Sequence, residues 1–221
     1  MPTKRPTYAV LMGDIVASER APSRREMHRV FNAAIARANK RHTETIASPL
    51  TITLGDEFQG LLTGLAKAWD VAAELRLALL SDAVPCRFVL GAATLDTPLN
   101  PQRAWNMMGE GLARAREKLD DKRPANAFRF SFPDHSVIET LLDAAGDALT
   151  QTELGWTDTQ RRYFHRSRGA GRSIVRIARD MGVSERSVYK VLSAANADFH
   201  DRQSQAIRRA LTHLDTQYGL T

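Results

Sequence analysis

Two Gly-Asp pairs at the ends of apolar runs have the residue types of a metal or phosphate site. Gly13-Asp14 ends an apolar run that begins at residue 8, and Gly55-Asp56 forms a turn between two further runs. An aspartate carboxylate can bind Mg²⁺, and a glycine lets a phosphate approach the backbone closely. If both pairs end neighbouring strands, they form one site for a cation or a phosphate group, with Glu57 as a candidate third metal ligand.

Each acidic residue also has a structural interpretation. Gly-Asp pairs are common in tight turns and at helix starts, so Asp14 and Asp56 can equally be turn formers or helix caps. Glu57 can be an outward-facing turn residue. The sequence leaves these alternatives open, because the metal interpretation depends on whether the two strand ends meet.

A basic segment after Gly109 is the next candidate. Arg114, Arg116 and Lys118 are candidate phosphate ligands, or they form a solvated helix face. The histidines lack the spacing of zinc ligands, and the chain lacks the Gly-x-x-x-x-Gly-Lys-Ser/Thr loop of P-loop proteins. The two Gly-Asp pairs therefore remain the strongest candidate site in the first part of the chain.

The composition is that of an ordinary globular protein. The 221 residues are 43% hydrophobic and 25% charged, and no apolar run approaches the ~20 residues of a membrane helix. The single cysteine, Cys86, excludes an intramolecular disulfide, and we expect a buried structural thiol. The N-terminus does not have the pattern of a signal peptide. We therefore expect a cytoplasmic protein without a membrane partner.

The elements that must position these residues follow the order β-α-β-β-α-β-α-β. Split β-α-β units of this kind predict an α+β fold with a mostly antiparallel sheet and helices on one face. Apolar periodicity predicts strands at 7–16, 49–54, 58–62, 85–94 and 127–132, and helices at 23–40, 66–80 and 103–119. We expect a sheet domain of residues 1–133, a helical linker of residues 134–155 and an all-α domain of residues 156–221.

The most specific pattern lies between Ser173 and Leu192. A short helical stripe ends at Gly182, which suits a left-handed turn, and Ser184 is a good N-cap for the next helix. This predicts a helix-turn-helix, whose second helix enters the major groove of DNA. The candidate DNA-binding residues are Arg172, Arg176, Arg179, Ser184, Arg186, Ser187, Tyr189 and Lys190.

The charge distribution also favours a DNA-binding tail. The net charge is +6, and from residue 150 onward there are 12 Lys+Arg against 7 Asp+Glu. Such an asymmetry is typical of a nucleic-acid-binding end on a neutral protein. A helix-turn-helix used only for protein contacts is the alternative. We expect the last helix, residues 201–218, to pack onto the motif, with a homodimer contact as the alternative.

The segments Met12–Ser18 and Thr51–Leu62 resemble the SatD family of bacterial proteins, and the resemblance covers most of the chain, including the helix-turn-helix tail. They are also similar to class III adenylyl cyclases and GGDEF diguanylate cyclases. That similarity implies a ferredoxin-like palm domain in which Asp14 and Asp56 hold Mg²⁺ against a nucleotide. The helix after Gly109 departs from the cyclase pattern, because Ala113 and Glu117 replace an asparagine and an arginine that act on the transition state.

Together these features predict a DNA-binding transcriptional regulator of SatD type. Its N-terminal domain would sense a nucleotide or an Mg-phosphate ligand. One alternative is a nucleotidyl cyclase-like phosphoryl-transfer enzyme with a DNA-targeting tail. The other is a degenerate palm domain that acts only in assembly.

Overall fold

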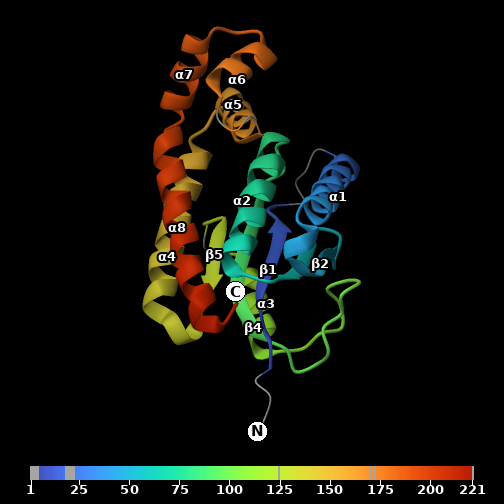
Figure 1. Cartoon of the computed structure of the whole chain (residues 1–221). Helices are drawn as coiled ribbons and strands as arrows, with labels where there is room; N and C mark the ends of the chain where they lie inside the picture. The colour runs from blue at the N-terminus through green and yellow to red at the C-terminus, as the bar shows by residue number, and fades with distance from the viewer. Residues whose placement is uncertain (1–4, 18–22, 124, 170, 172, 221) are drawn as a thin grey trace.

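A computed structural model of the chain describes residues 5–17, 23–123, 125–169, 171 and 173–220. In this part of the chain, a five-stranded sheet has the order β2-β3-β1-β4-β5, and helices pack around it (Figure 1). The strands are β1 (Thr7–Ile15), β2 (Ile46–Ile52), β3 (Glu57–Leu62), β4 (Cys86–Thr94) and β5 (Phe128–Ser131). The helices are α1 (Arg24–Arg41), α2 (Leu65–Ser81), α3 (Glu110–Asp120), α4 (Ser136–Leu154), α5 (Asp158–Gly169), α6 (Ile174–Met181), α7 (Glu185–Ala194) and α8 (Ala197–Tyr218).

The strand pairing confirms the expected α+β class. β1 lies between β3 and β4 and is antiparallel to both, and β2 is antiparallel to β3. This order of the first four strands is the split β-α-β arrangement of the ferredoxin-like fold. β5 extends the sheet beside β4 in parallel, after the crossover through α3. The sheet is therefore mostly antiparallel, as its strand signals predicted.

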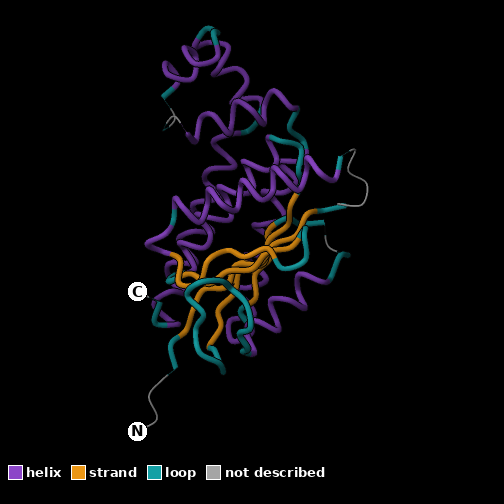
Figure 2. The backbone as a smooth tube through the Cα atoms, turned by 90° about the vertical axis from the view of Figure 1, so that its right-hand side faces the viewer, coloured by secondary structure: helices purple, strands orange, loops and turns teal. Residues whose placement is uncertain are grey.

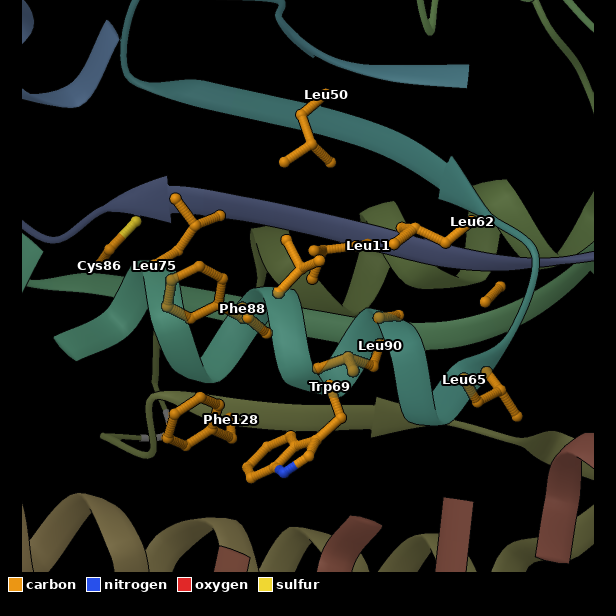
Figure 3. Close-up of a cluster of buried hydrophobic side chains, with 14 of the residues drawn as sticks. Leu11, Leu50, Leu62, Leu65, Trp69, Leu75, Cys86, Phe88, Leu90 and Phe128 are labelled. Atoms are coloured by element: carbon orange, nitrogen blue, oxygen red, sulfur yellow. The ribbon is translucent and has the colours of Figure 1, made fainter. Parts of the chain in front are cut away.

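The main core lies between one face of the sheet and α2. Leu11, Phe88 and Phe128 come from three strands and lie on the side of the sheet that α2 covers (Figure 3). The ring of Trp69, from α2, is centred 4.8 Å from that of Phe128. On its other side α2 buries Leu77 against the C-terminal helices. A helix buried on both sides is apolar around most of its circumference, which explains the weak amphipathic pattern of α2.

The expectation of helices on one face only is wrong, because α3 covers the opposite face. Val10 and Met12 of β1 alternate with core residues, so they point to this second face. There they pack with Ala115 and Leu119 of α3. Figure 2 shows helices on both sides of the strands. The sheet is thus sandwiched at its centre, and charged side chains on the α3 face are partly shielded from water.

The predicted helix 103–119 begins only at Glu110. The residues before it form a loop held by side chains of the sheet: the Ala104 amide donates to Thr51 Oγ1 at 2.9 Å, and the Gln59 side-chain amide donates to the Ala104 carbonyl at 2.6 Å. The Ala104 amide and carbonyl therefore make hydrogen bonds with side chains instead of the backbone hydrogen bonds of a helix. Asn106 has a φ of 59°, which is incompatible with a continuous α-helix.

The last helix packs onto the sheet domain, so the expectation that it packs onto the helix-turn-helix is wrong. Ile207, Leu211 and Leu214 of α8 belong to the main core, and the helix runs along α2 and α4. Figure 1 shows α8 leaving the α5–α7 end of the molecule and running back beside α4. A stripe of aliphatic residues does not specify which surface it will pack against. Here it packs against the apolar surface of the sheet domain.

One carboxylate on α8 fixes this arrangement. Asp215 accepts hydrogen bonds from the amides of Leu65, at 2.6 Å, and Ala66, at 3.1 Å, which are the first residues of α2. The residue before α2 is Gly64, which has no side chain to cap the helix. Asp215 therefore supplies a helix cap from a distant part of the chain.

Residues 134–155, predicted as a helical linker, lie mostly in α4. This helix packs on β5 and on α8. Its Leu142 and Leu149 belong to the main core. The division of the chain into three parts therefore stays a prediction. None of the helices in the described residues is both long and apolar enough to cross a membrane.

Candidate functional sites

The structure brings Asp14, Asp56 and Glu57 together. Asp14 lies directly opposite Glu57 in the β1–β3 pairing. The Ile15 amide donates to the Asp56 carbonyl oxygen at 2.9 Å, so the turn before β3 sits against the end of β1. The two Gly-Asp pairs, 42 positions apart in the chain, thus form one corner of the sheet on the face that α3 covers.

Local packing or backbone conformation explains why Gly13 and Gly55 are glycines. A Cβ at Gly13 would lie 2.5 Å from the Phe58 ring and 2.8 Å from the Arg87 carbonyl oxygen, so the missing side chain makes room for the main core. Gly55 has a φ of +76°, which favours glycine in the turn. Neither observation points to a phosphate at these positions.

The Asp14 carboxylate is buried among cations. Its side chain is 6% exposed; Arg87 Nε lies 2.9 Å from Oδ1, and Lys122 Nζ lies 2.5 Å from Oδ2. The Arg87 pair lies within ion-pair distance but lacks the alignment of a hydrogen bond, so its attraction is Coulombic. Burial raises the pKa of Asp14, and the hydrogen bond from Lys122 opposes that rise. The charged form is therefore held by two protein cations.

A third cation, Arg129, adds positive charge to this corner. It lies between Phe128 and Phe130 on β5, so it points to the α3 face, and it is 2% exposed. Its guanidinium donates to the backbone carbonyls of Lys118 and Asp121, at the end of α3. Burial lowers the pKa of Arg129, and the nearby Arg87 lowers it further. The sequence analysis did not identify Arg87 or Arg129 as site residues. The signal that could have found them is a charged residue at an inward-facing position of an apolar strand.

The three basic residues of α3 have partners in three different places. Arg116 donates to Glu57 at 2.8 Å and to Gln59 at 2.9 Å, so it joins the corner. Arg114 pairs with Glu110 on its own helix. Lys118 bonds the carboxylates of Glu139 and Asp143, each at 2.7 Å, and so ties α3 to α4.

These residues do not fit a resident Mg²⁺ ion. A magnesium site needs carboxylate oxygens that are available to the metal. Lys122 and Arg87 take the oxygens of Asp14, and Arg116 takes one oxygen of Glu57. Among the described residues, no group of three or more His, Cys, Asp or Glu side chains is arranged to hold a metal. The Asp14 carboxylate is thus neutralised by protein cations and is not left open for a metal.

The helix-turn-helix forms from the residues that predicted it. Gly182 ends α6 with a φ of 65°, and the Ser184 hydroxyl accepts from the Ser187 amide at 3.2 Å at the start of α7. Ile177 and Val188 pack in a small core between α5, α6 and α7. The hydroxyls of Ser184 and Ser187 lie 2.9 Å apart, within hydrogen-bond distance of each other.

The remaining DNA-binding candidates lie on the surface of this unit. Tyr189 is 61% exposed, and Arg186 and Lys190 are exposed beside it on α7. Arg176 and Arg179 are exposed on α6, and Arg176 lies 4.0 Å from Asp180. Arg172 lies outside the described residues.

The sequence profile of the SatD family matches residues 8–132, which is more than half of the chain. The chain belongs to the SatD family. The matched part of this SatD-family chain ends before α4, so the helix-turn-helix lies outside it. No curated protein matches the sequence.

Two kinds of solved structure are similar to the SatD-family chain. One is the monomeric guanylyl cyclase domain of the RhoGC fusion protein from the fungus Blastocladiella emersonii, at 16% identity and a TM-score of 0.44, over 62% of this chain and 86% of that one. The other is a bacterial light-regulated adenylyl cyclase, at 15% identity and a TM-score of 0.39, over 58% of this chain and 77% of that one. At these TM-scores the likeness carries no argument about activity.

Proposed function

We propose that the SatD-family chain binds DNA through α6 and α7. The observation that carries the proposal is the concentration of charge on one small helical unit. Residues 158–196 hold nine Lys and Arg against three Asp and Glu, an excess equal to the net charge of +6 for the whole chain. The rest of the chain is balanced. An electrostatic footprint of this kind, on a helix-turn-helix, is typical of DNA-binding proteins.

The exposed face of α7 supplies the groove contacts in this proposal. Arg186, Tyr189 and Lys190 lie exposed within one and a half turns of each other. An arginine can donate two hydrogen bonds to a guanine edge, and a lysine or tyrosine can reach bases or phosphates. Arg176 and Arg179 on α6 are placed for the DNA backbone.

The test is fluorescence anisotropy of the full chain with a labelled duplex at several salt concentrations. Each phosphate contact contributes roughly −0.9 to the slope of log K against log salt. The variant R186A/K190A should bind at least tenfold more weakly, with a shallower slope. The matched control R202A/R209A removes two exposed arginines of α8. The proposal fails if the wild type shows no salt-dependent binding, or if both variants lose affinity equally.

The regulatory half of the proposal is that a phosphate-bearing ligand alters DNA binding. The resemblance to cyclases implies a nucleotide and Mg²⁺ at Asp14 and Asp56, and the cations around Asp14 argue against the metal. Titration of the chain with ATP, with and without Mg²⁺, decides the matter. ATP binding that requires Mg²⁺ and is lost in D14N would support a metal site at Asp14. Product chromatography in the same samples tests the cyclase alternative.

A further inference from the structure

We propose that a cavity between α1, α2, α5 and α8 binds a small organic phosphate. The cavity has a volume of about 1080 Å³ and lies on the α2 side of the sheet, whereas Asp14 lies on the α3 side. This inference deepens the regulatory half of the proposed function by naming a different site for the ligand. It does not depend on DNA binding.

The cavity has the size and lining of a ligand site. Small-molecule pockets are about 300–1,000 Å³ and combine apolar walls with a few polar groups. Here the apolar part comes from α2, through Trp69, Ala73, Leu77 and Ala78. The Trp69 indole N–H already donates to the Ser204 hydroxyl, at 3.3 Å, so the ring is fixed in place. An apolar floor of this kind suits the carbon body of a ligand rather than an inorganic ion.

The charged part of the lining is mostly positive. Five cations face the cavity against two carboxylates; the cations are Arg37, Lys40, Arg41, Arg168 and Arg208, and the carboxylates are Asp70 and Glu74. Asp201 pairs with Arg168 from outside the lining, so five cations face three carboxylates and the excess is two positive charges. A concave site with such an excess attracts anions, because low-dielectric walls focus the field. The ligand should therefore carry a phosphate or a similar anionic group.

The carboxylates neutralise only some of these cations. Asp70 forms a two-point pair with Arg208, at 2.8 and 3.0 Å, and Glu74 pairs with Arg41 at 2.7 Å. Within the described residues, no carboxylate pairs with Arg37 or Lys40. These two side chains lie one turn apart on α1, so they can converge on one phosphate group.

Arg168 on α5 is the cation opposite α1. It lies over the Phe164 ring, 5.7 Å from its centre, and its nearest carboxylate, Asp201, is 3.5 Å away. Burial lowers the pKa of Arg168, although its side chain is still 36% exposed and can therefore reach a ligand in the cavity. An anion in the cavity would contact Arg168 on the α5 side, in addition to Asp201, and Arg37 and Lys40 on the α1 side.

A ligand in this position links the two functional units. α1 and α2 belong to the sheet domain, whereas α5 packs directly against α6 and α7 of the helix-turn-helix (Figure 1). A phosphate that bridges α1 and α5 stabilises one placement of the helix-turn-helix relative to the sheet. By linkage, DNA that prefers that placement would bind more tightly in the presence of the ligand.

Isothermal titration and thermal shift of the DNA-free chain test the site, in phosphate-free buffer without Mg²⁺. The probes are inorganic phosphate, phenyl phosphate and ADP. We expect the two organic phosphates to bind at least tenfold more tightly than inorganic phosphate. R37E/K40E should weaken them at least tenfold, whereas the control R202E/R209E, which changes the same charge at exposed positions outside the cavity, should stay within twofold. A78W should block the cavity without changing its charge.

Three outcomes would overturn the inference. One is that none of the probes binds at 5 mM. A second is that R37E/K40E and R202E/R209E weaken binding equally, which would indicate a general charge effect. The third is binding that survives R37E/K40E and A78W but is lost in D14N, which would place the phosphate at the Asp14 corner. The unfolding midpoint of each ligand-free variant shows whether it is folded.

Discussion

Replacing Glu153 by glutamine should destabilise the chain strongly, because it breaks a buried ionic cluster that joins four elements. Glu153 on α4 is 0% exposed and pairs with Arg76 of α2 at 2.7 Å and with His200 of α8 at 3.0 Å. Arg76 also donates to the Cys86 carbonyl of β4 at 2.8 Å. Without Glu153, Arg76 stays buried with no compensating carboxylate.

The expected loss is about 3–5 kcal/mol, the range for removing one partner of a buried ion pair. For a chain of this size, each kcal/mol lowers the unfolding midpoint by roughly 2–4 °C, so E153Q should unfold roughly 6–20 °C below the wild type. The double variant R76M/E153M removes both charges. It should lose less than the sum of the single changes, because the buried Arg76 charge is removed together with its carboxylate partner.

The effect should also depend on pH. Burial by itself would raise the pKa of Glu153, but the charges of Arg76 and His200 more than offset it, and the net result is a lowered pKa. A lowered folded-state pKa means that the stabilisation is fully present above the unfolded pKa, roughly 4.3. It is lost as the pH falls through the folded value. The gap between wild type and E153Q should therefore shrink as the pH falls below about 4.

Urea unfolding followed by far-UV circular dichroism measures the free energies of unfolding at each pH. A difference below about 1 kcal/mol at pH 7, or a difference that does not shrink in acid, would refute the reasoning. In the first case water or a neighbouring group must compensate Arg76, and in the second the stabilisation must come from packing rather than from the charge of Glu153.

Two substitutions and one labelling experiment test other parts of the fold. G13A should cost about 1–3 kcal/mol in urea unfolding, because its Cβ would lie 2.5 Å from the Phe58 ring; a loss within error of zero would show that the ring can move. D215A should cost about 1–2 kcal/mol and speed proteolysis of α8, since it removes the cap on the Leu65 amide; unchanged proteolysis would contradict that role. Burial raises the pKa of the Cys86 thiol, so a disulfide reagent should label it only after unfolding, and rapid labelling of the native chain would refute its burial.

The sequence predicted the parts of the structure that depend on neighbouring residues. Alternating and helical apolar patterns located the strands and most helices, because those periods follow from local backbone geometry. The helix-turn-helix was predictable for the same reason: the left-handed Gly182 and the Ser184 cap act within a few residues. The loop before α3 was not predictable, because its backbone groups form hydrogen bonds with side chains of β2 and β3, which are distant in the sequence.

The candidate sites depended on contacts between distant segments. The sequence indicated the acidic corner, but Lys122, which pairs with Asp14, lies 108 positions away along the chain. The cavity was not predictable from the sequence, because its cations on α1 meet walls from α5 and α8 that lie far away along the chain.

By itself, the sequence determined the order of elements, the family, the charge of the tail and the turn that makes its motif. Only the tertiary structure decided which cations neutralise Asp14, which surface α8 covers and where a cavity remains. The physical reason is that periodicity and capping act over a few residues. Ion pairs and cavities depend instead on how separate elements pack, and apolar or charged side chains do not encode their partners.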